Sequence, residues 1–259
     1  MRIIDAHVHV IDNYPSMTPF EGLGRYDRLL ALMDKNEVEK AVMVPVVAPV
    51  TPRNNEECAN LARSYSDRLS TLTDVPLDQT DAADRIAQAR QEYEAVGVSW
   101  YGDIANIVEP VWEALAVHDL TCNLHVGPPR FGLLLDLARA HPETKFIINH
   151  LGLPGGLDLA DGSYGGLNAA GSLDNVFVKV SGFYGVIGWD ISDPLAQDLL
   201  ASLLAGLGPE KLLWGSDWPP VAFRQTYQQS LEIVRTMADL TEPQRELILG
   251  GTAASVYGI

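Results

Sequence analysis

Residues 1–10 read MRIIDAHVHV, a short apolar run that ends in two histidines two positions apart. Side chains at positions i and i+2 of a β-strand point to the same face, so His7 and His9 are expected to project together from one strand end. Asp5 is expected on that same face, one layer further back. Two neutral imidazoles held this way suit a single metal ion such as zinc, and the alternative is a pair of hydrogen-bonded polar residues.

Seven further β-like runs follow this one, and several are almost continuously apolar, such as AVMVPVV and FVKV. Such runs are typical of strands in a parallel sheet that is buried on both faces. Together with the first, the runs are residues 2–7, 40–46, 69–75, 95–100, 121–126, 145–149, 176–180 and 211–215.

Helical patterns lie between these runs. Residues 241–249 begin with a capping box that has Pro243 in the first turn, and Gly250-Gly251 is expected to end this helix. Residues 151–175 are rich in glycine and predict a long loop with a short helix at most. The remaining helices are expected at residues 81–94, 108–118, 131–140 and 227–238.

Strands therefore alternate with helices along all 259 residues, which implies βαβ crossovers. Eight such units favour an α/β fold of the closed (β/α)8 TIM-barrel type over an open doubly wound sheet. Neither a linker nor an internal repeat interrupts the pattern, so residues 1–259 are expected to form one barrel domain.

Composition restricts the partners. The formal net charge of −16 repels nucleic acid and anionic membranes, and no apolar run reaches the roughly 18 residues that a membrane span needs. The N-terminus lacks the apolar core of a signal peptide, and Cys58 and Cys122 follow no C-x-x-C spacing, so a cytoplasmic protein with reduced thiols is expected. The expected partner is a small molecule, a carboxylate included, and a homo-oligomer remains open.

Polar residues mark the ends of several predicted strands. His125 ends the fifth run (TCNLHVG), His150 ends the sixth (FIINHLG), and Asp217 follows the eighth (LLWGSDWPP). In a (β/α)8 barrel the active site lies at the C-terminal ends of the strands, so these side chains should meet His7 and His9 on one rim.

The other two histidines have a structural interpretation. His118 and His141 both fall at the expected C-terminus of a helix, where a partly exposed imidazolium suits the helix dipole. The sequence contains neither a G-x-S-x-G elbow nor a G-x-G-x-x-G loop after a strand, which argues against serine-hydrolase chemistry and dinucleotide binding.

The set D-x-H-x-H, N-H-L-G and G-S-D-W-P resembles the amidohydrolase superfamily. The resemblance is to the amidohydrolase 2 branch, which contains sugar lactonases, pyrone-dicarboxylate lactonases and metal-dependent decarboxylases. It extends over essentially the whole chain, through NEECANLARSYSDRLSTLTDVPLD, KVSGFYG and GGTAASVYGI. Thr252 departs from the branch, which often has asparagine there. The resemblance implies a TIM barrel of the metallo-dependent hydrolase type.

A second departure bears on the metal. Binuclear relatives use a carbamylated lysine on the fourth strand to bridge two ions, and Ser99 of GVSWYG stands in the matching place. A serine cannot form that bridge. The resemblance therefore implies one divalent ion, with zinc as the expected metal, although some lactonases of the branch require none.

The resemblance also implies roles for the rim residues. His7, His9, His125 and Asp217 would hold the ion and leave one position for a water whose pKa falls toward neutrality. His150 would hydrogen-bond to that water or to the substrate carbonyl, or would only orient another group. Asp217 would take the proton of the water and deliver it to the leaving group.

Residues that follow the strands could bind the substrate. An arginine on this rim would suit a carboxylate, whereas the alternative for each arginine is a solvated loop position. The expected substrate-binding residues are Tyr101, Asp103, Arg130, Tyr184, Trp218 and Arg53.

The sequence thus predicts a metal-dependent hydrolase of a lactone or a related carbonyl compound, with Asp217 as general base and acid. The alternative is a metal-dependent, non-oxidative decarboxylase on the same site, which must anchor a carboxylate and protonate carbon. A barrel that binds a ligand without turnover is disfavoured, because binding alone does not require all of these rim residues together.

Overall fold

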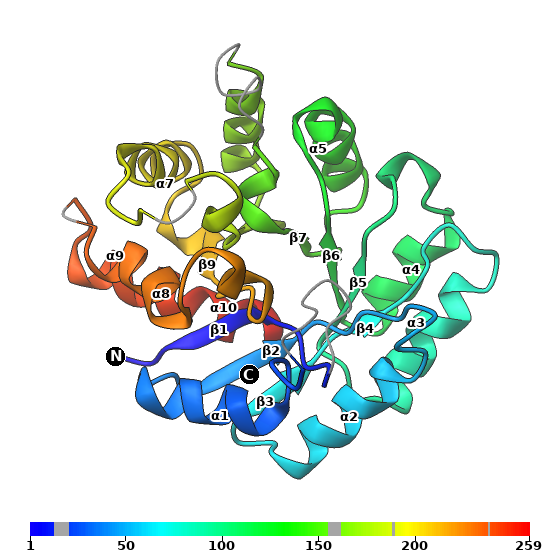
Figure 1. Ribbon diagram of the computed structural model, residues 1–259. Coiled ribbons are helices and arrows are strands. Elements are labelled where there is room, and N and C mark those ends of the chain that lie inside the picture. The colour runs from blue at the N-terminus through cyan, green and yellow to red at the C-terminus, as the bar shows by residue number, and fades with distance from the viewer. Residues whose placement is uncertain (13–20, 155–161, 188–189, 238) are drawn as a thin grey trace.

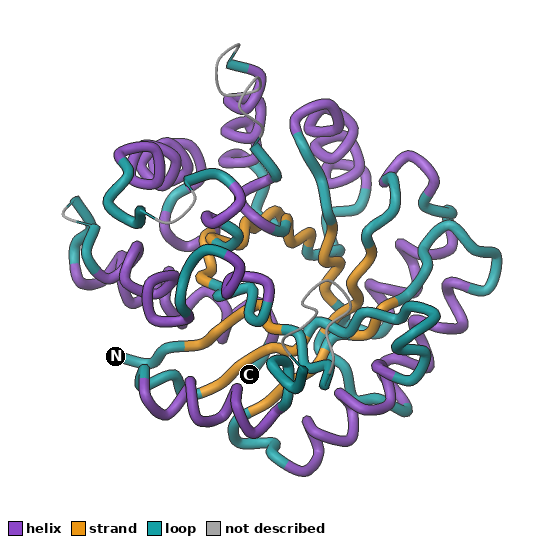
Figure 2. Tube along the Cα trace, viewed as in Figure 1, coloured by secondary structure: helices purple, strands orange, loops and turns teal. Residues whose placement is uncertain are grey.

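The computed structural model describes residues 1–12, 21–154, 162–187, 190–237 and 239–259. Its described strands run parallel in the centre of the molecule, and helices surround them (Figures 1 and 2). Each of the eight predicted runs overlaps at least one strand. The strands are β1 (Ile4–Val8), β2 (Lys40–Met43), β3 (Leu69–Thr71), β4 (Thr73–Asp74), β5 (Gly97–Trp100), β6 (Thr121–Leu124), β7 (Phe146–Ile148), β8 (Val176–Val180) and β9 (Leu212–Trp214).

The strands pair in chain order, as β1-β2-β3 and as β4-β5-β6-β7-β8-β9. β3 and β4 are two halves of one predicted run, and the Val96 N–H donates to the Thr71 carbonyl at 2.9 Å, which continues the ladder across the break. At the junction between β1 and the segment that follows β9, the Asp217 N–H donates to the His7 carbonyl at 2.9 Å, and Val8 forms a parallel β-bridge with Trp218. These bonds close the predicted (β/α)8 barrel.

The described α-helices are α1 (Tyr26–Lys35), α2 (Asn54–Ser64), α3 (Ala82–Gln91), α4 (Pro110–Val117), α5 (Phe131–Ala140), α7 (Pro194–Leu207), α8 (Tyr227–Arg235), α9 (Glu242–Glu246) and α10 (Thr252–Tyr257). His118 and His141 follow α4 and α5 directly, as predicted, and His141 stacks on Trp112. Between β7 and β8 the glycine-rich segment forms a 3₁₀-helix at Ser163–Ser172. None of the helices in the described ranges is long and apolar enough to cross a membrane.

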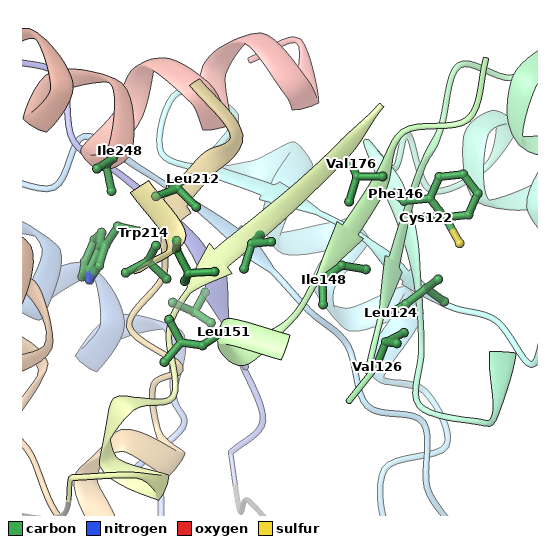
Figure 3. Packing of buried hydrophobic residues seen from close by; sticks show 14 of the residues in the cluster. Cys122, Leu124, Val126, Phe146, Ile148, Leu151, Val176, Leu212, Trp214 and Ile248 are labelled. Atoms are coloured by element: carbon green, nitrogen blue, oxygen red, sulfur yellow. The ribbon is translucent and has the colours of Figure 1, made fainter. Parts of the chain in front are cut away.

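The core has an outer and an inner layer. In the outer layer, apolar side chains of the strands and of the surrounding helices form one buried cluster. Figure 3 labels Leu124, Ile148, Val176 and Trp214 among its strand residues. The inner layer fills the barrel, where Ile4, Val42, Ile147 and Leu213 pack with side chains of α10. Because Arg2 also donates to the carbonyl of Ile259 at 3.0 Å, α10 lies at the N-terminal end of β1, away from the strand ends that carry the histidines.

The expected helix end at Gly250-Gly251 is wrong. The chain stays helical from α9 through a π-turn at Leu247–Gly251 into α10. Gly250 has a different role, because a Cβ there would lie 2.2 Å from the carbonyl oxygen of Arg2. The glycine allows the helix to approach the backbone that precedes β1.

We expect Gly250→Ala to lower the free energy of unfolding by roughly 1–3 kcal/mol, the usual cost of overpacking a core. Gly251→Ala is the matched control. Gly251 has helical φ −58° and ψ −46°, and a Cβ added there would have the flexible Leu247 side chain, at 3.3 Å, as its nearest neighbour. It should be neutral or stabilising, because alanine favours a helix over glycine. Urea unfolding of both variants measures the difference, and equal stabilities would contradict this explanation.

Candidate active site

A cavity of about 570 Å³ opens at the C-terminal ends of the strands, where the sequence predicted the site. Residues from the ends of seven different strands or from the loops after them contribute to it, which is the usual arrangement for a barrel enzyme. The cavity is lined by His9, Val46, Tyr101, His125, His150, Leu153, Gly182, Tyr184, Gly185, Asp217, Pro220 and Phe223.

The end of β1 is irregular. Asp5 pairs with Ala41 and Val8 pairs with Met43, so two residues of β1 oppose the single residue Val42 of β2. Such a bulge re-aims the side chains beside it. Asp5 therefore does not stand beside the two histidines: its Oδ1 accepts from the backbone N–H groups of His7 and Ser216. Burial, only partly offset by these hydrogen bonds, raises the pKa of Asp5 to about 6.

The two histidines of β1 converge beyond this bulge. His9 Nδ1 lies 2.7 Å from the carbonyl oxygen of Val44, which can only accept, so Nδ1 carries the proton and Nε2 presents a lone pair. His7 Nε2 lies 3.2 Å from His9 Nε2. Burial, together with the nearby charge of Lys179, holds the pKa of His7 well below its ordinary value, so this ring is neutral and able to ligate a metal.

Asp217 completes a three-membered group. Its Oδ1 lies 3.3 Å from His9 Nε2 and 3.6 Å from His7 Nε2, and that buried oxygen accepts no hydrogen bond from the residues that the structure describes. Tetrahedral zinc, with bonds of about 2.0–2.1 Å, places its ligand atoms roughly 3.3 Å apart. The three measured separations fit one such ion, and two imidazoles with one carboxylate are a suitable donor set for it.

The backbone and the second oxygen of Asp217 are also fixed. The residue has φ 58°, in the left-handed region, and its Oδ2 accepts from the Tyr184 hydroxyl at 2.7 Å. Burial alone would raise the pKa of Asp217, but the neighbouring His150 and His9 and the Tyr184 hydroxyl outweigh it and hold that pKa below its ordinary value. The carboxylate is therefore ionised at neutral pH.

His150 faces the same carboxylate. Its Nδ1 lies 3.8 Å from Asp217 Oδ2 and 3.0 Å from the Ser181 hydroxyl oxygen. It too has a left-handed backbone, with φ 52°, and Gly182 packs so closely that a Cβ there would lie 3.0 Å from the His150 Cβ. Residues held in this region are frequent at functional sites.

His125 lies in the cavity but outside the three-membered group. Its ring centroid is 4.9 Å from that of His150 and 4.8 Å from that of Tyr101. Nδ1 is buried and has no hydrogen-bond partner within the described ranges, and burial lowers the pKa of His125 to about 3. Three of the four predicted ligands thus converge, and ligation by His125 stays a prediction.

Sequence reasoning did not assign Lys179 to the site. This side chain of β8 is fully buried, and its Nζ lies 3.3 Å from His7 Nδ1. Burial lowers the pKa of Lys179 to about 7. The signal in the sequence is a lysine inside the otherwise apolar FVKV strand, because a buried lysine is rare unless it has a partner.

The expected substrate-binding residues divide into two groups. Tyr101 and Tyr184 line the cavity, whereas Trp218 is only 2% exposed and does not. Arg130 donates to both carboxylate oxygens of Asp103, at 2.8 and 2.6 Å, and is not part of the lining. Arg53 pairs with Glu56 at 3.1 Å and lines a separate hollow.

Comparison with known proteins defines the family. The amidohydrolase family profile matches residues 4–259, so the chain belongs to that family. It is 26% identical over 239 residues to an L-fucono-1,5-lactonase from Burkholderia ambifaria. The alignment covers 83% of this chain and 80% of the relative.

Solved structures share the fold. An amidohydrolase from Burkholderia multivorans with bound zinc superposes with a TM-score of 0.82 at 21% identity, over 100% of both chains. A 5-carboxyvanillate decarboxylase from Sphingomonas paucimobilis superposes with a TM-score of 0.72 at 17% identity, over 100% of this chain and 99% of that one. The same barrel therefore supports both hydrolases and decarboxylases, and only the site can distinguish them.

Proposed function

We propose that this chain is a metal-dependent hydrolase of lactones. The observation that carries the proposal is the meeting of two buried imidazole nitrogens with a carboxylate oxygen that accepts no hydrogen bond from the described residues. The three atoms have the spacing of one tetrahedral ion, and His9 and Asp217 line the cavity. The relationship to an L-fucono-1,5-lactonase supports a lactone as the bond that is cleaved. Ser99 on β5, in place of a bridging lysine, supports one ion per chain.

His7, His9 and Asp217 would hold the ion, as three protein ligands do in catalytic zinc sites. A divalent ion bound there supplies a Lewis acid for the lactone carbonyl and lowers the pKa of a water molecule. We expect His125, beyond the three-membered group, to contact the substrate.

The protein groups account for the proton transfers. Asp217, kept ionised and oriented by the Tyr184 hydroxyl, accepts a proton from the water that attacks the acyl carbon. The bond between the acyl carbon and the ring oxygen then breaks, and Asp217 returns the proton to that oxygen. His150, held by Ser181 and Gly182, hydrogen-bonds to the carbonyl oxygen. The product is a hydroxy acid, which ionises and releases one proton.

Acid release from a 1,5-lactone in weakly buffered solution tests this function. We expect about one divalent ion per chain in protein purified without chelator, loss of activity after chelation, and recovery with zinc. A content near two ions would contradict the argument from Ser99. Full activity in metal-free protein would remove the metal from the proposal.

The decarboxylase alternative is tested in parallel. The structural likeness to 5-carboxyvanillate decarboxylase shows a shared barrel, not a shared reaction. Release of carbon dioxide from an aromatic carboxylate, without any hydrolysis of lactones, would replace the proposed function by this alternative.

A further inference from the structure

We propose that the substrate is an uncharged lactone, and that the site selects against lactones that carry a carboxylate or a sulfonate. This inference rests on the proposed function and specifies its substrate class. It follows from the charges that the cavity offers to a ligand.

The described residues that line the cavity include neither lysine nor arginine. The ranges outside the description do not contain one either: residues 13–20 read NYPSMTPF, residues 155–161 read GGLDLAD, residues 188–189 read GW, and position 238 is alanine. No side chain from those ranges can therefore add a cation to the cavity.

The cations near the rim have other partners among the described residues, and Arg53 pairs with Glu56 at 3.1 Å and lines a separate hollow. Arg130 is held by both oxygens of Asp103. Arg224 donates to the carbonyl oxygen of Tyr184 at 3.3 Å and lines a different hollow. Lys179 is fully buried against His7 and does not reach the cavity.

Away from the histidines, Tyr184 and Asp217, the wall of the cavity is apolar and aromatic. Val46, Leu153, Pro220 and Phe223 line it together with Tyr101. Such a surface suits the C–H faces of a small uncharged ring, whereas a carboxylate placed against it would lose water without gaining a partner. The net charge of −16 adds a long-range repulsion of anions.

A matched pair of substrates tests the inference: a hexono-1,5-lactone with a CH2OH group on the ring, and its counterpart with a carboxylate at that carbon. We expect kcat/KM to be roughly tenfold or more higher for the uncharged lactone, since the carboxylate would be desolvated without a partner. An equal or higher value for the carboxylated lactone, with both hydrolysed, overturns this inference and leaves the proposed function standing. Hydrolysis of neither by zinc-loaded protein overturns both.

Variants of Phe223, which is 45% exposed at the rim, make the charge argument specific. Phe223→Arg supplies the missing cation and should raise kcat/KM for the carboxylated lactone roughly twofold to fivefold, as expected for an exposed ion pair. Two control variants should leave kcat/KM for the carboxylated lactone unchanged. Phe223→Gln adds no charge, and Val117→Arg adds the same charge on α4, outside the cavity lining. A gain in either control would show that the effect does not come from a cation in the cavity, and would contradict the inference.

Discussion

Replacing Asp217 by asparagine should lower kcat roughly 100-fold or more, because general acid–base catalysis contributes at least about that much. The amide is nearly isosteric with the carboxylate but cannot accept and return the proton. Asparagine also tolerates the left-handed backbone of this residue, with φ 58°, so the fold should be unchanged.

Lactone hydrolysis under saturating zinc is the measurement for this variant. Excess metal should not restore the rate, which separates proton transfer from metal ligation. Asp119→Asn is the matched control, because Asp119 is exposed in the loop between α4 and β6 and pairs only with Lys145 in the described contacts. A near-normal rate for Asp217→Asn would show that the carboxylate merely stabilises the turn before Trp218 and would remove it from the mechanism.

The barrel and the rim of the site were predictable for a simple physical reason. Apolar runs that alternate with helical patterns specify a parallel sheet, and the C-terminal ends of parallel strands meet at one edge. His125, His150 and Asp217 could therefore be placed beside His7 and His9 although most of the chain separates them.

Details that depend on how two segments meet could not be read from either segment alone. The bulge in β1 arises in its pairing with β2, and it moved Asp5 away from the site. In the sequence, the pair Gly250-Gly251 is typical of a helix end. In the structure, a glycine is required at position 250 because the carbonyl of Arg2, far away in sequence, lies against it.

The contacts of Arg130 on the rim also could not be predicted from the sequence. Topology placed Arg130 and Asp103 after neighbouring strands, and both could have faced the substrate. Which groups pair is decided by the loop conformations, and here the two side chains bind each other. That pairing lowers the pKa of Asp103 to about 2 and changes the expected substrate from a possible anion to an uncharged lactone.

The second large effect is expected from replacing one of the three residues that would hold the ion. We expect His9→Gln to reduce zinc affinity by more than the roughly 10–100-fold that loss of an outer hydrogen-bond partner costs. His9 supplies one of the three donor atoms, and the Val44 carbonyl fixes its ring so that Nε2 faces the other two. Glutamine preserves a polar side chain of similar size, so circular dichroism should report an unchanged fold.

The same substitution at two other histidines gives the comparison. His125→Gln should retain its zinc and lose activity, because the three-membered group does not include His125 although its ring lines the cavity. His141→Gln, at the end of α5, should change neither quantity. Elemental analysis after dialysis, with a zinc titration of each variant, separates the cases. If His125→Gln loses zinc as fully as His9→Gln, then four residues hold the ion, His125 is a ligand as the sequence predicted, and its role in contacting substrate must be abandoned.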